Sequence, residues 1–215
     1  MQQVRTVLDT TDIAARAEFR RHFRAEEDFI ASATATALTM LGIFTFRLPE
    51  ADIDRIRVVG IMNTALNLQL SSFKLWMSGH TVASGSLFRQ VIEGISLAFL
   101  FSARELPFLQ RYEDDEYSGR HAVRDLKRHT KDARVQPHAM NAIESAYHFH
   151  HRFAHLSKLT IAASASFSKG GIPQLGGHFD AEKLPQYVKE ARNRARFARV
   201  LPNAVLGVCS NLARW

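Results

Sequence analysis

Residues 79–101, GHTVASGSLFRQVIEGISLAFLF, are the stretch that decides the fold. They predict one helix that is apolar on almost every side and carries only two charges, Arg89 and Glu93. Because a helix without a wide polar face must be enclosed by others, we expect it at the centre of the protein. A buried Arg–Glu pair is unfavourable unless it is well hydrogen-bonded, so the two side chains are candidates for a structural clamp or a pocket wall.

Helical patterns continue on both sides of this segment, with proline, glycine and acidic residues at the expected helix boundaries. Helices are expected over residues 12–46, 51–78, 81–103, 108–131, 137–166 and 181–200. A glycine-containing loop over 168–177 separates the last two, and Pro202 is expected to start a short terminal helix. No segment alternates well between apolar and polar residues. The chain is therefore predicted to be an all-α bundle of about five to seven helices, with long antiparallel pairs.

Composition indicates one globular domain. The chain has 215 residues, of which 46% are hydrophobic and 23% are charged. We expect a single domain over residues 1–215, with a core over about 48–200 and an N-terminal helical segment over 1–47. Cys209 is the only cysteine, which excludes an intramolecular disulfide and a multi-cysteine zinc site and fits a reducing compartment.

The location of the protein is predicted from its N-terminal third. The first residues, MQQVRTVLDTTD, lack the apolar stretch of a signal peptide. Residues 29–46 carry no charge and approach the length of a membrane span, but their serine and threonine content favours a buried helix. We therefore expect a cytoplasmic protein that makes no membrane contact. The net charge of +7 suits acidic partners.

Histidines cluster in YHFHHRFAHLS, residues 147–157. His151 and His155 are four residues apart and could share a metal ion on one helix face. No HExxH motif is present, and no carboxylate follows before Asp180, so we expect neither a metal nor a cofactor. His155 and Ser157 have small and apolar neighbours, and we expect them to face inward as partners of the Arg89–Glu93 pair.

Arg124 and His129 are candidate catalytic residues. An arginine, a polar residue and a histidine a few positions later is the pattern of HEPN ribonucleases, in which the two side chains flank an RNA phosphate without a metal. Here Asp125 follows the arginine. The alternative interpretation of the same residues is a solvated, charged helix surface.

A basic stripe is predicted near the C-terminus, in KEARNRARFAR. Its members share one helix face: Lys189, Arg192, Arg196 and Arg199. Such a face could bind nucleic-acid phosphates without sequence preference. It could equally be an ordinary solvated surface.

The segment ASGSLFRQVIEGISLAFLF resembles the "LxRxxxE plus apolar helix" landmark of an uncharacterised bacterial all-helical family. Tyr147 with His155-Leu156-Ser157, followed by Gly176-Gly177 and Asp180, resembles that family's second landmark. The resemblance covers about residues 67–193. That family often has a histidine after the Leu-Ser step, whereas here His155 precedes it. Arg89 and Glu93 match the first landmark by position.

The resemblance has implications for architecture and association. The family is similar to HEPN-like helical domains, which implies helical hairpins, homodimers and a link to prokaryotic defence or toxin systems. It implies no established reaction. We therefore expect an interaction or regulatory protein without catalysis. The alternatives are a metal-independent HEPN-like ribonuclease that uses Arg124 and His129, and a nucleic-acid-binding module that uses the basic stripe.

Overall fold

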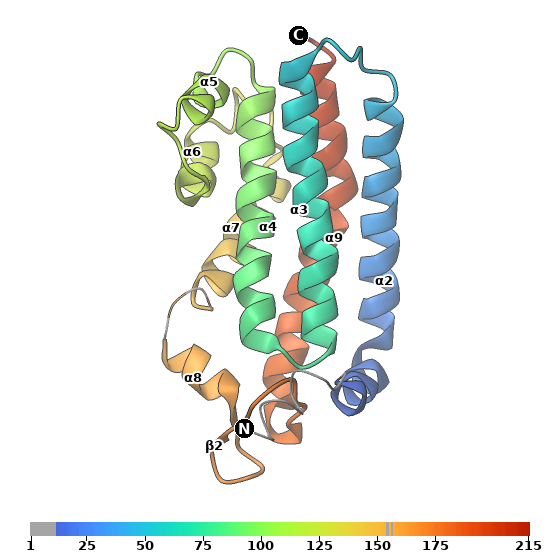
Figure 1. The fold of residues 1–215 in the computed structure, drawn as a ribbon, viewed down its shortest axis with the longest axis vertical. Coiled ribbons are helices and arrows are strands. Elements are labelled where there is room, and N and C mark those ends of the chain that lie inside the picture. Colours follow the sequence, from blue (N-terminus) through green and yellow to red (C-terminus); the bar gives the residue numbers. More distant parts are fainter. Residues whose placement is uncertain (1–11, 154, 156) are drawn as a thin grey trace.

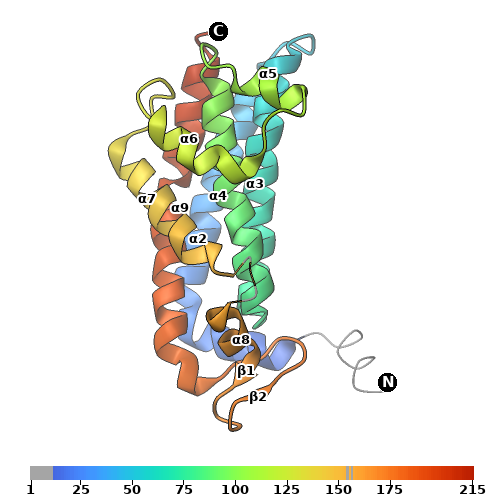
Figure 2. The same ribbon diagram turned by 90° about the vertical axis from the view of Figure 1, so that its left-hand side faces the viewer.

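The computed structural model describes residues 12–153, 155 and 157–215. The N-terminal residues 1–11 and Leu156 of the second landmark lie outside the described residues. Four long helices run side by side and form the bundle (Figures 1 and 2). They are α2 (Ile13–Thr45), α3 (Ile53–Met77), α4 (Thr81–Ser102) and α9 (Leu184–Leu212). The predicted all-α fold is confirmed.

Helix α4, the segment that opened the sequence analysis, lies at the centre of the protein. It packs most extensively on α3 and also contacts α6, α7, α8 and α9. Phe88, Val91, Ile92 and Leu100 are fully buried on it. Covering both sides of an apolar helix in this way removes nearly all of its hydrocarbon from water, which is the main source of stability in such a fold.

Short helices cover the outer side of α4 (Figure 2). They are α5 (Phe108–Glu113), the 3₁₀ turn η1 (Gly119–His121), α6 (Ala122–Arg128) and α7 (Pro137–His151). The single charged helix expected over residues 108–131 is therefore divided into pieces. Asp115, with a φ of 58°, adopts a left-handed conformation that a continuous helix does not allow.

Two predicted helix boundaries were wrong. The helix expected over residues 137–166 ends at His151, and a separate helix, α8 (Lys158–Ser164), begins after Ser157. The helix expected to stop near Val200 continues through Pro202 to Leu212. Proline removes one backbone hydrogen bond there, but burial of the apolar residues on both sides of it keeps the helix continuous. The core accordingly extends beyond residues 48–200, to α2 and to the end of α9.

A small hairpin follows α8. Its strands β1 (Ala165–Ser166) and β2 (Ile172–Pro173) pair antiparallel, and this is the only sheet within the described residues. A 3₁₀ turn, η2 (Ala181–Lys183), then leads into α9. The hairpin and α8 lie together at one end of the bundle (Figure 1).

An aromatic cluster closes this end of the bundle from inside. The ring of Phe19 lies 5.0 Å from Trp76, 5.2 Å from Phe179 and 4.8 Å from Tyr187, measured between centroids. Phe23, where α2 leaves helical geometry, packs on the same indole at 5.1 Å. Because the cluster joins α2, α3 and α9, it fixes the start of α9 against the bundle.

Candidate functional site

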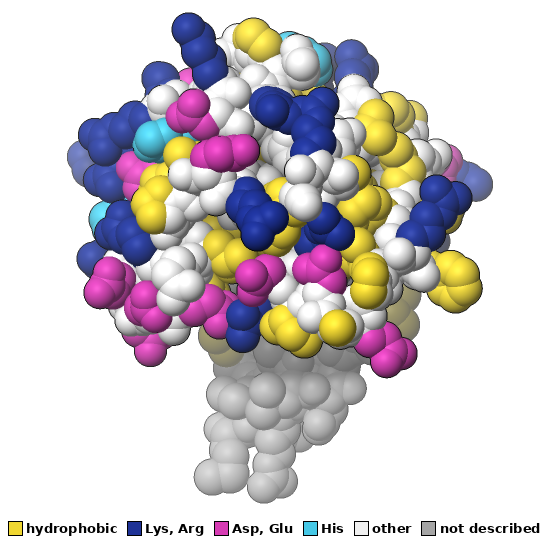
Figure 3. Space-filling view, turned by 90° about the horizontal axis from the view of Figure 1, so that it is seen from above, with side chains coloured by type: hydrophobic (Ala, Val, Ile, Leu, Met, Phe, Trp, Pro, Cys, Tyr) yellow, Lys and Arg dark blue, Asp and Glu magenta, His cyan; other side chains and the backbone are white. Residues whose placement is uncertain are grey.

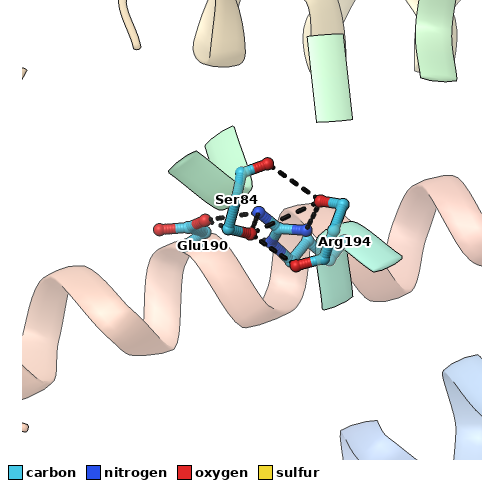
Figure 4. Close-up of polar contacts among 4 residues, drawn as sticks. Ser84, Glu190 and Arg194 are labelled. Atoms are coloured by element: carbon cyan, nitrogen blue, oxygen red, sulfur yellow. Dashed lines mark hydrogen bonds and ion pairs between the residues drawn. The ribbon is translucent and has the colours of Figure 1, made fainter. Parts of the chain in front are cut away.

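A fully buried ion pair lies on the inner face of α9. Arg194 donates from Nε (3.0 Å) and Nη2 (2.9 Å) to one carboxylate oxygen of Glu190, Oε1 (Figure 4). The side chains are 0% and 2% exposed. Four residues apart on one helix, the two groups face each other across one turn. Charges this deeply buried are tolerated only when further polar groups surround them.

The remaining donors of Arg194 reach the two neighbouring helices. Nη1 donates to Ser72 Oγ on α3 (2.9 Å), and Nη2 donates to Ser84 Oγ on α4 (2.6 Å). Each serine hydroxyl also donates to the other serine's carbonyl, at 2.9 and 2.7 Å. The guanidinium carbon lies 4.7 Å from the centre of the Phe88 ring. Two small hydroxyl side chains therefore make room for the guanidinium and tie three helices together.

Burial controls the charge states around this pair. Desolvation raises the pKa of Glu190, and the guanidinium of Arg194 opposes that shift. Desolvation also lowers the pKa of His150 well below its usual value, with a smaller contribution in the same direction from Arg194. The His150 ring is 0% exposed, packs 4.4 Å from Phe88 and finds no hydrogen-bond partner in the described part of the chain. A neutral histidine thus lies beside a charged pair in the buried core.

A cleft of about 510 Å³ opens beside Glu190, between α8, the start of α9 and the first residue of α4. We call it the α8–α9 cleft. It is lined by Thr81, Phe153, Leu159, Ala162, Ala163, Phe167, Glu182, Lys183, Pro185, Gln186, Tyr187, Lys189 and Glu190. Its walls are mostly hydrocarbon, and only a few polar groups reach it.

Lys183 holds the outer wall of the cleft in place. Its ammonium donates to the carbonyl of Ala163 (3.0 Å) and to that of Ala165, at the end of α8, and lies 5.1 Å from the Phe167 ring. Desolvation lowers the pKa of Lys183, and the negative charge of Asp180 opposes this shift. Positive charge at exposed helix carbonyls is favourable, so Lys183 secures the junction between α8 and the hairpin.

The loop that precedes α9 is fixed by close backbone packing. Gly177 lies so near the α3–α4 turn that a Cβ there would overlap the Ser78 carbonyl oxygen. Its N–H donates to Asp12 Oδ1 (3.1 Å), and the other Asp12 oxygen is 2.6 Å from His80 Nε2. The loop before α9 is therefore attached to α2 and to the start of α4, which limits movement of the cleft walls.

The predicted pair Arg89–Glu93 forms, but it is not buried in the core. Arg89 Nε donates to Glu93 Oε1 at 2.8 Å, and the side chains are 16% and 15% exposed. They lie on the side of α4 that faces α7, where the guanidinium carbon is 5.7 Å from the Tyr147 ring. The covering helix α7 is short and carries polar side chains, so this face of α4 stays partly wet. The fully buried Arg–Glu pair is on α9 instead.

His155 and Ser157 do not join Arg89 as an inward pair. His155 is exposed and packs on His151, with 4.9 Å between ring centroids. Ser157 is the N-cap of α8, where its hydroxyl accepts from the Thr160 N–H and donates to the Arg152 carbonyl. The expectation of a shared polar cluster was wrong because α7 ends at His151, with Arg152 as its C-cap. Beyond that point the helical spacing used to place these side chains does not apply.

Arg124 and His129 are each held by their own carboxylate. Arg124 Nε donates to Asp125 Oδ1 (2.9 Å), whereas His129 Nδ1 lies 2.9 Å from Asp132 Oδ2. Hydrogen bonding to Asp125 raises the pKa of Arg124, whose side chain is exposed, whereas His129 is half-buried. Asp125, in contrast, is buried, and it also accepts a hydrogen bond from the Tyr117 hydroxyl (3.1 Å). The structure of one chain does not bring Arg124 and His129 together.

The basic stripe of α9 is exposed along its whole length. Lys189, Arg192, Arg196 and Arg199 all face solvent, and none forms an ion pair with the part of the chain that the structure describes. Arg199 lies over the Phe29 ring at 5.8 Å. Lys189 also lines the α8–α9 cleft. The stripe and the cleft therefore meet at one residue.

Sequence analysis missed the Glu190–Arg194 pair, although a signal was present. Tyr187, Glu190, Arg194, Phe197 and Leu201 follow one another at helical spacing and are all buried. The apolar ends of that row mark the inner face of α9, and the two charges lie between them. Because arginines surround this row in the sequence, the whole segment was interpreted as a charged surface helix.

Within the described residues no group of three or more histidine, cysteine or carboxylate side chains could hold a metal ion. No protein-family model, curated protein sequence or solved structure matches the chain.

Proposed function

We propose that this protein is a non-catalytic interaction or regulatory module that binds an apolar small molecule in the α8–α9 cleft. One observation carries the proposal: Glu190, the acidic member of a buried ion pair, is among the residues that line an apolar cleft of about 510 Å³. Small-molecule sites are typically about 300–1,000 Å³, mostly apolar, and carry a few polar groups that orient the ligand. The cleft has this size and this balance of groups.

The polar contacts indicate how a ligand would be oriented. Both hydrogen bonds from Arg194 go to Glu190 Oε1, so we assign Oε2 to a donor from the ligand, in competition with the Trp76 side chain, which also lowers the pKa of this carboxyl group by hydrogen bonding. Tyr187, whose pKa burial raises to about 12, stays protonated and is also at the wall. The preferred ligand is therefore mainly hydrocarbon, with a hydrogen-bond donor for Glu190 and an acceptor for the Tyr187 hydroxyl.

The position of Glu190 supports a regulatory role. A ligand that donates to this carboxylate weakens its hold on Arg194, and Arg194 is bound to α3 and α4 through Ser72 and Ser84. Occupancy of the cleft would thus change the contact between three helices. A shift of this kind requires only that the ligand prefer one arrangement of the cluster over another.

Titration with a neutral apolar dye, N-phenyl-1-naphthylamine, tests the proposal. Ala162→Phe places a ring inside the cleft, and Ala25→Phe is the matched control at an exposed site on α2. We expect saturable binding to the native protein and to the control, and a loss of more than about tenfold in affinity for Ala162→Phe. Equal affinity for all three proteins, or no binding by the native protein, would contradict the proposal.

The unpaired stripe of α9 supports one alternative proposal, the binding of nucleic-acid phosphates. Four exposed cations without acidic partners in the described residues would give sequence-independent, salt-sensitive affinity. Binding of single-stranded RNA should weaken with a log–log salt slope of about −0.7 for each phosphate contact. In the double variant Arg192→Ala/Arg196→Ala that slope should become less negative, because phosphate contacts are lost. Failure to bind RNA at low salt would exclude this alternative.

A further inference from the structure

A second cavity lies where the start of α7 meets the last turns of α9, and we call it the α7–α9 cavity. Figure 2 shows the two helices side by side there. Its volume is about 440 Å³, within the range of roughly 300–1,000 Å³ that is typical of small-molecule sites. It shares no lining residue with the α8–α9 cleft, so it is a separate candidate site.

The lining of this cavity is basic. Arg134, His138 and Arg214 contribute to it, and no aspartate or glutamate does. Neither arginine side chain forms an ion pair or a hydrogen bond with the part of the chain that the structure describes. Asp132 and Glu105 lie with both arginines around a smaller neighbouring cavity of about 30 Å³, but at more than ion-pair distance. Seen from above, acidic side chains gather mainly on the side of α5 (Figure 3). Positive charge without a counter-charge favours a bound anion.

The backbone at Arg134 indicates independently that its side chain has a use. The turn after α6 closes with hydrogen bonds from the Val135 N–H to the Thr130 carbonyl (2.9 Å) and from the Arg134 N–H to the Lys131 carbonyl (3.1 Å). This is the pattern of a Schellman motif, in which glycine usually occupies the residue with positive φ. Here Arg134 occupies it, with a φ of 53°. Side chains are disfavoured at such positions, and residues held in sparsely populated conformations cluster at functional sites.

A buried amide fixes the backbone from which both arginines project. Asn211 is 6% exposed, and its Nδ2 donates to the Ala133 carbonyl (3.0 Å) and to Ser102 Oγ (3.1 Å). Ala133 directly precedes Arg134, and Arg214 follows Asn211 by about one turn at the end of α9. The same side chain therefore holds the α6–α7 turn against α9. A site on elements that are tied together in this way is better defined than one on a free loop.

The rest of the lining divides into uncharged polar groups and hydrocarbon. Gln136, Asn203 and Ser210 reach the cavity, and none of these side chains has a hydrogen bond within the described residues. Gln136 is also the N-cap of α7, whose first turn has no side-chain cap, so the positive end of that helix adds to the local potential. Phe99 and Leu206 provide an apolar wall, and Leu206 is 52% exposed. The cavity therefore suits a ligand with one anionic end and one apolar end.

We propose that the α7–α9 cavity binds a small phosphomonoester, with its phosphate on Arg134 and Arg214 and its organic group against Phe99 and Leu206. A phosphomonoester carries a charge of about −1.5 to −2 at pH 7, which two guanidinium groups neutralise. Guanidinium groups also bind phosphate oxygens in pairs, with a geometry that suits both partners. The basic stripe leads to the cavity along α9, because Asn203 follows Arg199 by four residues, and its positive potential would concentrate such an anion nearby.

Isothermal titration calorimetry with phenyl phosphate, in a buffer free of phosphate and sulfate, tests this proposal. The native protein should bind phenyl phosphate saturably, and it should bind phenyl sulfate, which carries a single charge, at least about tenfold more weakly. Arg214→Ala and Arg134→Gly should each lower the affinity for phenyl phosphate by at least about tenfold. Arg24→Ala, at an exposed site on α2, is the matched control and should keep the native affinity.

Arg134→Gly separates binding from folding. Glycine is the usual residue at this φ, so the variant should unfold at the same temperature as the native protein or at a higher one. A loss of affinity in this variant therefore reports the missing guanidinium and not a damaged fold. Circular dichroism during heating provides the comparison.

Four results would overturn the proposal. The first is a native protein that shows no saturable binding of phenyl phosphate at millimolar concentration. The second is native affinity in either Arg134→Gly or Arg214→Ala, which would place the phosphate elsewhere. The third is equal affinity for phenyl sulfate, which would make the site a general anion site. The fourth is binding of a 5′-phosphorylated RNA oligonucleotide by a native protein that does not bind phenyl phosphate, which would make the cavity a nucleic-acid contact. These measurements do not depend on the α8–α9 cleft.

Discussion

Replacing the Glu190–Arg194 pair one residue at a time and then together should give strongly non-additive losses of stability. Arg194→Met leaves a buried carboxylate without its partner, and Glu190→Leu leaves a buried guanidinium. Each should lower the free energy of unfolding by about 3–5 kcal/mol, the usual result of breaking a buried ion pair. In Arg194→Met part of that loss should be recovered at low pH, because burial raises the pKa of Glu190 and the carboxyl group can take up a proton.

The double variant Glu190→Leu/Arg194→Met should be much less damaging than the sum of the two. It removes both charges and fills the space with hydrocarbon, a change that is often neutral or stabilising. Ser72 and Ser84 keep partners in it, because each hydroxyl still donates to the other residue's carbonyl. The coupling energy of this cycle should therefore be at least about 3 kcal/mol.

The half-buried pair on α4 provides the matched control. Arg89→Met, Glu93→Leu and their combination alter residues of the same types at the same spacing, but with side chains 16% and 15% exposed. Their coupling energy should stay below about 1 kcal/mol. Urea unfolding at neutral pH, followed by circular dichroism, measures both cycles. Equal coupling energies in the two cycles would refute the view that Glu190–Arg194 is the buried polar centre of the bundle.

Three further predictions concern groups near this centre. Gln69→Leu should raise the free energy of unfolding by roughly 1–2 kcal/mol in urea titrations, because neither amide atom of this buried side chain has a partner in the described residues; a loss of stability would contradict this. His150 has a folded-state pKa below its unfolded value of about 6.5, so stability should be complete above that pH and fall, by at most about 1.4 kcal/mol per unit, as pH drops toward the folded pKa; the slope should shrink in His150→Phe. Gly177→Ala should lower stability by about 2–3 kcal/mol in thermal unfolding, since its Cβ would clash with the Ser78 carbonyl oxygen, and an unchanged midpoint would contradict the packing described.

The sequence predicted the fold class because the helical signals are long and mutually consistent. Residues 79–101 leave no polar face, and α4 is central as expected. The predicted boundaries of α4 were close to the observed ones, because glycine and proline mark the ends of this segment. Where boundaries failed, at His151 and Pro202, tertiary packing outweighed the local pattern.

The candidate site was less predictable than the fold. Spacing correctly indicated that an Arg–Glu pair four residues apart would form on α4, but it could not show which of two such pairs is fully buried. That depends on what covers each helix: α7 covers Arg89 only partly, whereas α3 and α4 enclose Arg194 completely. The serines that bind Arg194 are more than 100 residues away from it along the chain, and no local pattern connects them.

The α8–α9 cleft could not be foreseen from a pattern either. Its walls come from α4, α8, the hairpin and α9, and the break after His151 that creates α8 was not predicted. Lys183 shows the difficulty well. In the sequence, Lys183 lies in the first turn of the helix expected over residues 181–200. Only the fold shows that it binds the carbonyls at the end of α8.

A crystal structure of the protein grown with N-phenyl-1-naphthylamine tests the proposed binding function most directly. The dye should occupy the space between α8 and α9, with its rings against Tyr187 and its N–H directed to Glu190. Dye bound only elsewhere on the protein, with the α8–α9 cleft unchanged, would contradict the proposed function.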